Sequence, residues 1–191
     1  MKITKGNAGY LRARRKQLII KAVLEFGIVL ALLGLGIWQT GTRLNLLTVV
    51  AVLGCLPASK ALVEVITIFP HHSIADETAE EIKEKAKLLT TVFDLVITSR
   101  EKIMPIDSIA MLDNIVCGYT SSQKVDAAYA EKHIKQILEE NRYSKLTVKI
   151  FPDYKAFLTR VEGMENMAEV NRPDTQKKEA AIRQIILNIS L

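Results

Sequence analysis

Two long apolar segments lie close together near the start of this 191-residue chain, and they constrain its fold more than any other feature. The first runs from about Ala22 to Trp38 and the second from about Leu44 to Phe69, with Leu46–Ala58 free of charge. A helix needs about 20 apolar residues to cross about 30 Å of hydrocarbon, and both segments come close to this length. We therefore expect two transmembrane helices.

The connector between the two segments, Gln39–Arg43, is short and contains Gly41, so the helices must be antiparallel neighbours. Trp38 stands where an interfacial aromatic residue is expected. A cleaved signal peptide fits less well, because no small-x-small pattern precedes Trp38 and a second span follows at once. A buried helical hairpin of a soluble protein is the remaining alternative.

The charge of the chain follows the same division. The first 70 residues hold nine Lys or Arg and two Glu, whereas the others hold 17 Lys or Arg and 19 Asp or Glu. The net charge of +5 therefore reflects membrane orientation, and we expect no nucleic-acid partner. We expect both termini in the cytoplasm, because the N-terminal flank is richer in cations than the connector. The flank holds Lys2, Lys5, Arg12, Arg14, Arg15 and Lys16, and the connector holds Arg43.

Four ionisable residues lie inside the apolar segments, namely Lys21, Glu25, Lys60 and Glu64. All four are far from Gly41 along the chain, so they fall near the cytoplasmic ends of the two helices. Besides the pairs within each helix, Glu25 is expected to meet Lys60 and Lys21 to meet Glu64. We interpret this intramembrane charged cluster as a network of ion pairs that sets helix depth. A proton or ion path, or a docking site for another membrane protein, is the alternative.

After the hairpin, the hydrophobic pattern changes to that of an α/β domain. The dipeptide Asp113-Asn114 suits a hairpin turn, because both residues tolerate positive φ. The fold class is therefore a membrane α-helical hairpin followed by a small two-layer α/β cytoplasmic domain with a mixed sheet of about four strands. Helices are predicted at Asp76–Leu89, Val125–Glu140, Asp153–Val161 and Thr175–Ser190, strands at Val92–Thr98, Asp107–Leu112, Ile115–Thr120 and Leu146–Phe151, and a loop at Gly163–Arg172.

These elements divide the chain into a basic flank (1–16), a transmembrane hairpin (17–70), a juxtamembrane helix (71–90) and the α/β domain (91–191). Cys55 and Cys117 fall in different parts of this topology, so no disulfide is expected. No zinc spacing is present, and the adjacent His71 and His72 point in different directions. We therefore expect neither a metal nor a cofactor.

The element order over Asp76–Phe151 resembles the core of the PD-(D/E)xK nuclease superfamily. That resemblance implies an acidic residue at the start of the second core strand and an acidic-x-Lys pair on the third. Pro105-Ile-Asp107 matches the first position, but Asn114–Tyr119 lacks the second, which removes the Mg²⁺ cage. The chain also resembles uncharacterised small two-span membrane proteins of Gram-positive anaerobes.

The segment Gly118–Lys124 joins a predicted strand to a predicted helix. Helix N-termini attract anions, so this loop is a candidate anion-binding site. It is not a Walker loop, because no GxxxxGK[ST] is present. Ordinary capping of the helix by Ser121 or Ser122 is the alternative. The side chains that would assist an anion are Thr120, Ser121, Ser122 and Lys124.

An acidic site at Asp107 and Asp113 is the other candidate for chemistry, whereas His133 is placed on the exposed side of its helix without a Ser or Cys partner. The sequence thus predicts a membrane-anchored module of non-enzymatic interaction or regulatory type, in contact with the bilayer and with a protein partner or a second copy. A transferase-like or degenerate nuclease-like enzyme would need Asp107, Asp113 and the Gly118–Lys124 loop in one pocket. A component of an oligomeric membrane transport complex would need Glu25 and Lys60 to face each other across subunits.

Overall fold

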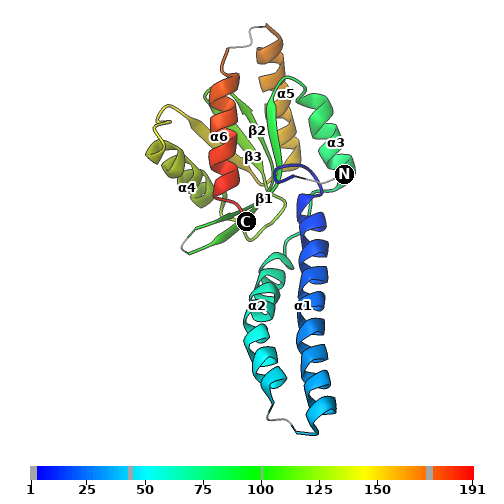
Figure 1. Ribbon diagram of the computed structural model, residues 1–191. Helices are drawn as coiled ribbons and strands as arrows, with labels where there is room; N and C mark the ends of the chain where they lie inside the picture. The colour runs from blue at the N-terminus through cyan, green and yellow to red at the C-terminus, as the bar shows by residue number, and fades with distance from the viewer. Residues whose placement is uncertain (1–3, 43–44, 100, 171–173) are drawn as a thin grey trace. The chain divides into compact units, whose positions relative to one another are not determined.

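The computed structural model describes residues 4–42, 45–99, 101–170 and 174–191, and it divides the chain into two compact units (Figure 1). One unit is a helical hairpin, Leu11–His72. The other is an α/β domain that combines the residues up to Tyr10 with Ser73–Leu191. The structure thus groups the start of the basic flank and the juxtamembrane helix with the α/β domain, where the sequence treats them as separate segments.

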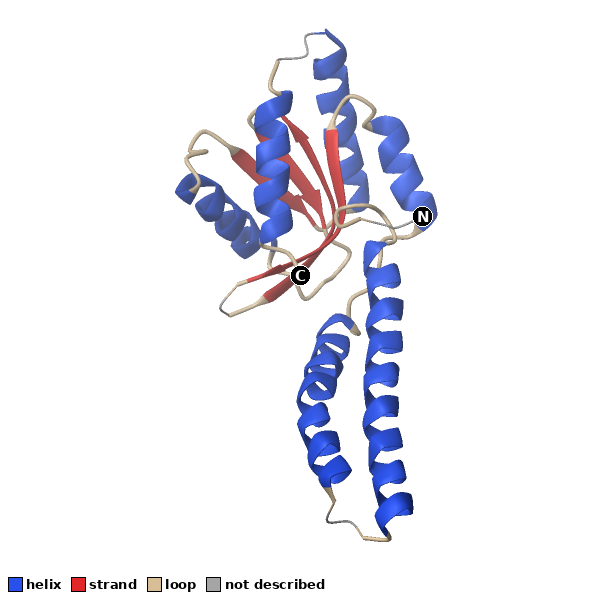
Figure 2. Cartoon of the chain, in the orientation of Figure 1, coloured by secondary structure: helices blue, strands red, loops and turns tan. Residues whose placement is uncertain are grey.

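The hairpin consists of α1 (Tyr10–Thr40) and α2 (Leu46–Ile68), which lie side by side (Figure 2). After α1, Gly41 adopts φ +67°, a left-handed conformation that glycine reaches without strain. Asn45 caps α2, because its side chain accepts a hydrogen bond of 2.9 Å from Thr48 N. Both helices are long and apolar enough to cross a membrane, as the sequence predicts.

Small side chains form the contact between α1 and α2. A Cβ atom at Gly36 would lie 2.7 Å from Asn45 Oδ1, so only glycine allows this close approach. Many of the larger apolar side chains point away from the contact, and Leu30 and Leu56 are 68% and 71% exposed. Buried positions recur mostly every seven residues, at Leu18, Ala22, Val29 and Gly36 on α1 and at Ala51, Ala58, Ala61 and Ile68 on α2.

A four-stranded mixed sheet forms the centre of the α/β domain, in the order β1-β2-β3-β4. β1 (Thr90–Thr98), β2 (Ile103–Leu112) and β3 (Ile115–Tyr119) are antiparallel neighbours, whereas β4 (Thr147–Phe151) is parallel to β3. Asp113 adopts φ +47° between β2 and β3, which confirms the predicted turn. The parallel pair requires a crossover, and α4 (Ala127–Glu140) supplies it.

Helices cover both faces of the sheet, so the domain has three layers where two are predicted. One core joins the sheet to α4 and α6 (Gln176–Asn188), and the other joins it to α3 (Asp76–Lys85) and α5 (Tyr154–Val170). Ile109 belongs to the first core and its neighbour Ala110 to the second, as the alternation of side chains along a strand requires. The hairpin, the α/β domain and the mixed four-stranded sheet are confirmed.

The helix α5 is longer than predicted, because it continues through Gly163 to Val170, where the sequence predicts a loop. Glycine in a helix interior costs about 1 kcal/mol relative to alanine. Burial of Val161, Met164 and Ala168 in one core outweighs this cost. In contrast, α3 ends at Lys85, before the predicted Leu89.

Both outer edges of the sheet contact other parts of the domain. On the β1 side, Phe93 N donates to Gly6 O and Leu191 N donates to Val96 O, each at 2.9 Å. On the β4 side, α4 supplies a carboxylate oxygen 2.9 Å from the amide of Ile150. Covered edges disfavour the addition of a strand from another chain.

Candidate functional site

The four ionisable residues within the apolar segments do not join the two helices. Among the described residues, Lys21 pairs with Glu25 within α1, with Nζ 3.8 Å from Oε1, whereas neither Lys60 nor Glu64 forms an ion pair. Glu25 Oε2 is buried and has no hydrogen-bond partner in the part of the chain that the structure describes. Lys60 is exposed and Glu64 is half-buried. The expected contacts of Glu25 with Lys60 and of Lys21 with Glu64 are therefore not formed in this structure.

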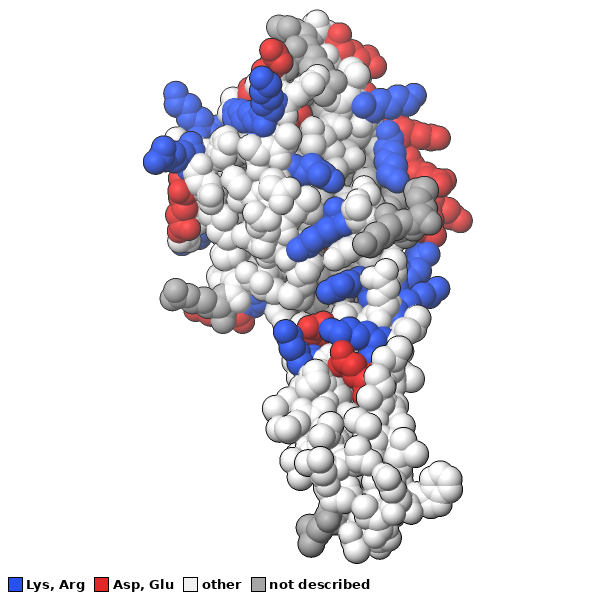
Figure 3. All heavy atoms as spheres, viewed as in Figure 1, with Lys and Arg blue, Asp and Glu red and all other residues white. Residues whose placement is uncertain are grey.

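Charge is also unevenly distributed along the hairpin. On the face shown in Figure 3, the half next to the connector is free of Lys, Arg, Asp and Glu, and charged side chains gather at the other end. At that end, the Arg15 guanidinium lies 5.8 Å from the centre of the Phe69 ring and links the start of α1 to the end of α2. The hairpin thus has one apolar end and one basic end.

The loop that the sequence marks as anion-binding contacts a carboxylate of the protein itself. Asp107 Oδ2 accepts a hydrogen bond of 2.5 Å from Ser121 N. Thr120 Oγ1 donates to Pro105 O at 2.8 Å, and Ser122 N donates to Thr120 Oγ1 at 3.3 Å. Two of the predicted candidates, Asp107 and this loop, therefore lie together, but Asp107 already occupies an amide that an external anion would need.

The start of α4 differs from the capping expected for this loop. Asp126 is the N-cap, and its side chain accepts a hydrogen bond of 3.2 Å from Tyr129 N. Neither Ser121 nor Ser122 caps the helix, because α4 begins only at Ala127. Lys124 is exposed. The negative charge of Asp126 also satisfies the positive end of the helix dipole.

At the level of Asp107, β1 and β2 change the face to which their side chains point. Phe93 and Leu95 are two residues apart, yet they belong to opposite cores. Between them, Asp94 adopts φ +56°, is 2% exposed, and accepts a hydrogen bond of 3.0 Å from Ile74 N. In β2, Ser108 is fully buried, and its Oγ has no partner among the described residues. Of these two buried polar side chains, Asp94 bonds to the domain's own backbone.

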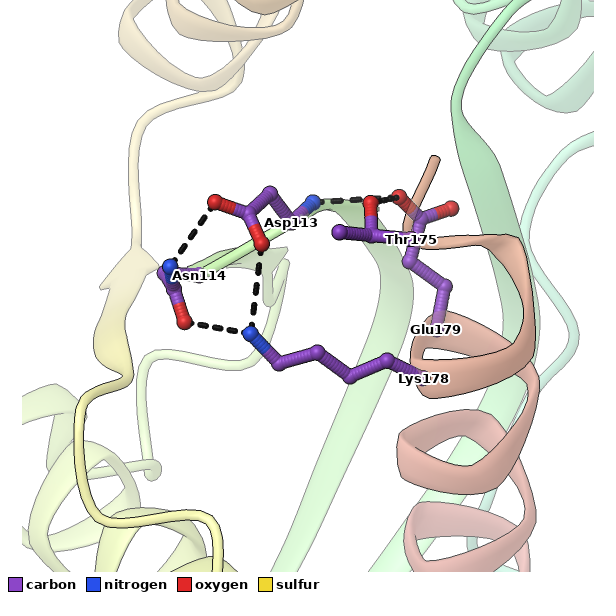
Figure 4. A network of polar contacts seen from close by, with 5 residues as sticks. All are labelled: Asp113, Asn114, Thr175, Lys178 and Glu179. Atoms are coloured by element: carbon purple, nitrogen blue, oxygen red, sulfur yellow. Dashed lines mark hydrogen bonds and ion pairs between the residues drawn. The ribbon is translucent and has the colours of Figure 1, made fainter. Parts of the chain in front are cut away.

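Asp113 takes part in a different network, which joins the β2–β3 turn to α6 (Figure 4). Lys178 Nζ donates to Asp113 Oδ1 at 3.2 Å and to Asn114 Oδ1 at 2.5 Å. Asn114 Nδ2 donates to Asp113 Oδ2 at 2.8 Å. Six residues of extended strand span about 20 Å, so Asp107 and Asp113 do not share a pocket.

Glu179 is the centre of this network, and it was not among the residues that the sequence singled out. It is 1% exposed, and its Oε1 accepts hydrogen bonds of 3.0 Å from Asp113 N and from Thr175 Oγ1. Its Oε2 accepts a hydrogen bond of 2.6 Å from Thr90 Oγ1. Glu179 lies three residues before Ile182 and therefore on the same, apolar face of α6. A charged residue on a face that points to the core was the signal in the sequence that could have identified it.

An open hollow of about 530 Å³ lies beside this turn. Its lining is mainly apolar, and its charged group, Asp113, is already bound to Lys178. The exposed fractions of Met167 and Val170 are 53% and 89%. The hollow suits the docking of apolar side chains better than proton or phosphate chemistry. It is lined by Leu112, Asp113, Asn114, Ile115, Asn166, Met167 and Val170.

A second hollow, of about 460 Å³, is polar and lies beside α4. The Tyr129 hydroxyl is 3.1 Å from Ser99 Oγ, and Lys102 Nζ lies 4.6 Å from the centre of the Tyr129 ring. His133 stacks on Tyr129 with ring centres 6.3 Å apart. His133 is half-buried, and its Nε2 is buried with no partner within the described ranges, so its predicted exposed position is wrong. The lining residues are Ser99, Glu101, Tyr129, His133, Gln136, Ile137 and Glu140.

Within the described ranges, no group of three or more His, Cys, Asp or Glu is placed to hold a metal ion. Cys55 and Cys117 are free thiols, the first exposed and the second buried. Burial raises the pKa of the Cys117 thiol, and Arg160 opposes that shift without reversing it. A thiol with a raised pKa is protonated at neutral pH and reacts slowly as a nucleophile.

Comparison with known proteins adds no assignment to this geometry. No family model matches the chain, and neither a curated protein nor a solved structure shows significant similarity to it. The function must therefore be argued from the exposed apolar hairpin, the two hollows and the polar networks themselves.

Proposed function

We propose that the chain is a two-pass membrane anchor that holds an α/β domain at the cytoplasmic surface of the cell membrane, where the domain binds a protein partner and acts without catalysis. The supporting observation is the exposure of the large apolar side chains of the hairpin, such as Leu30 at 68% and Leu56 at 71%. A water-soluble hairpin would bury these side chains, whereas a hairpin in lipid places them against acyl chains. The excess of Lys and Arg in the N-terminal flank favours cytoplasmic termini.

The partner is inferred from the surface of the domain. Backbone groups of both edge strands already bond to other parts of the domain, which disfavours pairing through an added strand. Met167 and Val170 leave apolar surface exposed beside the hollow at the β2–β3 turn. Apolar surface of this kind is typical of protein interaction sites.

Topology is tested with single cysteines in a variant that lacks Cys55 and Cys117. Thr42→Cys lies after α1, and Gln123→Cys lies in an exposed loop of the domain. An impermeant maleimide should label Thr42→Cys in intact cells and Gln123→Cys only in inverted vesicles. Labelling of both positions from one side, or release of the protein by alkaline carbonate, would contradict the anchor.

Partner binding is tested by mild detergent extraction followed by mass spectrometry of the proteins that co-purify. Met167→Arg should remove a specific partner. Ile103→Arg is the matched control, because Ile103 is 52% exposed elsewhere on the domain. A solitary monomer, or a partner retained equally by both variants, would contradict the proposed interaction.

A further inference from the structure

The part of the hairpin that carries no charge is shorter than an ordinary membrane is thick. No Lys, Arg, Asp or Glu lies between Phe26 and Thr40 of α1 or between Leu46 and Ser59 of α2. At a rise of about 1.5 Å per residue, these sections are about 22 Å and about 21 Å long. The hydrocarbon layer of a typical bilayer is about 30 Å thick. The two helices therefore agree with each other and differ from the typical bilayer by about 8 Å.

In α1, the charges beyond this section are able to avoid the hydrocarbon. Helical side chains lean toward the N-terminus of their helix, which in α1 is the basic end. Lys21 therefore leans toward that end, and it pairs with Glu25 at 3.8 Å. A lysine in this position reaches the interface with its ammonium group while its methylene groups stay in lipid.

In α2, the same rule has the opposite effect, because the helix runs in the opposite direction. The side chain of Lys60 leans toward the connector and thus toward the centre of the bilayer. Neither Lys60 nor Glu64 forms an ion pair among the described residues, and Lys60 is exposed. An unpaired charge inside the hydrocarbon costs several kcal/mol. Lys60 therefore marks the point at which α2 must leave the hydrocarbon.

We infer that the hairpin fits a bilayer with a hydrocarbon layer of about 22–24 Å, thinner than that of a typical membrane. In such a bilayer, Lys60 and Glu64 lie at the cytoplasmic interface and Trp38 lies at the opposite interface. Trp38 is 86% exposed and stands next to the polar connector, which suits that position. This inference rests on the proposed membrane anchor and adds the class of lipid surface that the anchor selects.

Trp38 is the single tryptophan of the chain, so its emission reports the position of the connector directly. The full chain is reconstituted in phosphatidylcholine vesicles whose monounsaturated acyl chains range from about 14 to about 22 carbons. Trp38 should be quenched well by acrylamide in the thinnest bilayers. As thickness increases, quenching should fall roughly twofold and emission should shift to shorter wavelength, because the basic end and the attached domain keep the other end of the hairpin in water.

A pair of matched variants separates hairpin length from general charge effects. Lys60→Ala/Glu64→Ala should move the loss of quenching to longer acyl chains, since it lengthens the charge-free part of α2. Lys135→Ala/Glu139→Ala removes a pair with the same spacing from exposed positions of α4, and it should leave the curve unchanged.

The possible outcomes distinguish this inference from the anchor on which it rests. If the protein stays outside the vesicles, and Trp38 is equally exposed to acrylamide in every lipid, the anchor itself is contradicted. If the protein inserts, but the quenching of Trp38 stays constant up to acyl chains of about 18 carbons, only the thin-bilayer inference is overturned. The curve of the unmodified chain decides this point even if a variant does not fold.

Discussion

The hairpin and the α/β domain differ in where most of their large apolar side chains lie. In the hairpin, Ala51, Ala58 and Ala61 are fully buried, while Leu30 and Leu56 point outward. In the domain, Phe157 and Ile134 are fully buried. Burial of apolar area stabilises a protein only against water, so the domain has the pattern of a water-soluble fold, and the hairpin has the pattern of helices in lipid. Direct measurements on the two regions test this difference.

The largest effect is expected in the core of the domain. Phe157→Ala removes a fully buried ring and should lower the free energy of unfolding by about 3–5 kcal/mol. Leu30→Ala is the matched change in the hairpin, and it should alter that free energy by less than about 0.5 kcal/mol in detergent. Urea unfolding followed by circular dichroism measures both. A comparable loss for the two variants would show that the hairpin also depends on apolar burial against water.

The next effect concerns the buried carboxylate of Glu179. Glu179→Ala leaves Asp113 N and the hydroxyls of Thr90 and Thr175 without this acceptor, which should cost about 2–3 kcal/mol. Lys178→Ala removes a partly exposed ion pair with Asp113 and a hydrogen bond to Asn114, and should cost about 1 kcal/mol. The same unfolding experiment compares them. Equal costs would mean that the turn depends on the ion pair as much as on the buried acceptor.

In the hairpin, enlarging a small buried residue should separate the helices. Ala58→Leu should lengthen the distance between α1 and α2 by about 1–2 Å, because the contact has no room for larger side chains. Spin labels on Gly27→Cys and the native Cys55 measure it by dipolar spectroscopy, since both positions are exposed and equally far along the chain from Gly41. Leu56→Ala should leave the distance unchanged, and an increase there would argue against the assigned packing.

The smallest effect is a pH dependence at Tyr154. Burial, with the hydrogen bond of 2.6 Å to Glu81, raises the pKa of Tyr154 above its usual range. A raised pKa means that folding favours the neutral phenol, so this stabilisation is complete below about pH 10 and declines as the pH rises further. As the pH rises from about 10 to about 11, Tyr154→Phe should therefore lose less stability than the unmodified domain. If the urea midpoints of the two proteins changed in parallel with pH, the predicted pH dependence of Tyr154 would be wrong.

Most secondary structure followed from local patterns, whereas the polar sites did not. The Asp113–Asn114 turn and the strands around it were predictable because turn residues and alternation act over a few positions. The end of α5 was not, because burial of Met164 and Ala168 outweighs the local effect of Gly163. Long-range pairing explains the other differences. Asp107 meets Ser121, and Glu179 meets Thr90, only after the sheet has formed.

The hydrogen bonds at β1 place the hairpin in the domain as an insertion. Phe93 N donates a hydrogen bond to Gly6 O, which lies before the hairpin in the sequence. The carboxylate of Asp94 accepts a hydrogen bond from Ile74 N, which lies after it. Adjacent residues of one strand thus fix both ends of the inserted segment side by side. Both hydrogen bonds join residues of the α/β domain to one another. A substitution confined to α1 or α2 is therefore expected to leave the sheet intact.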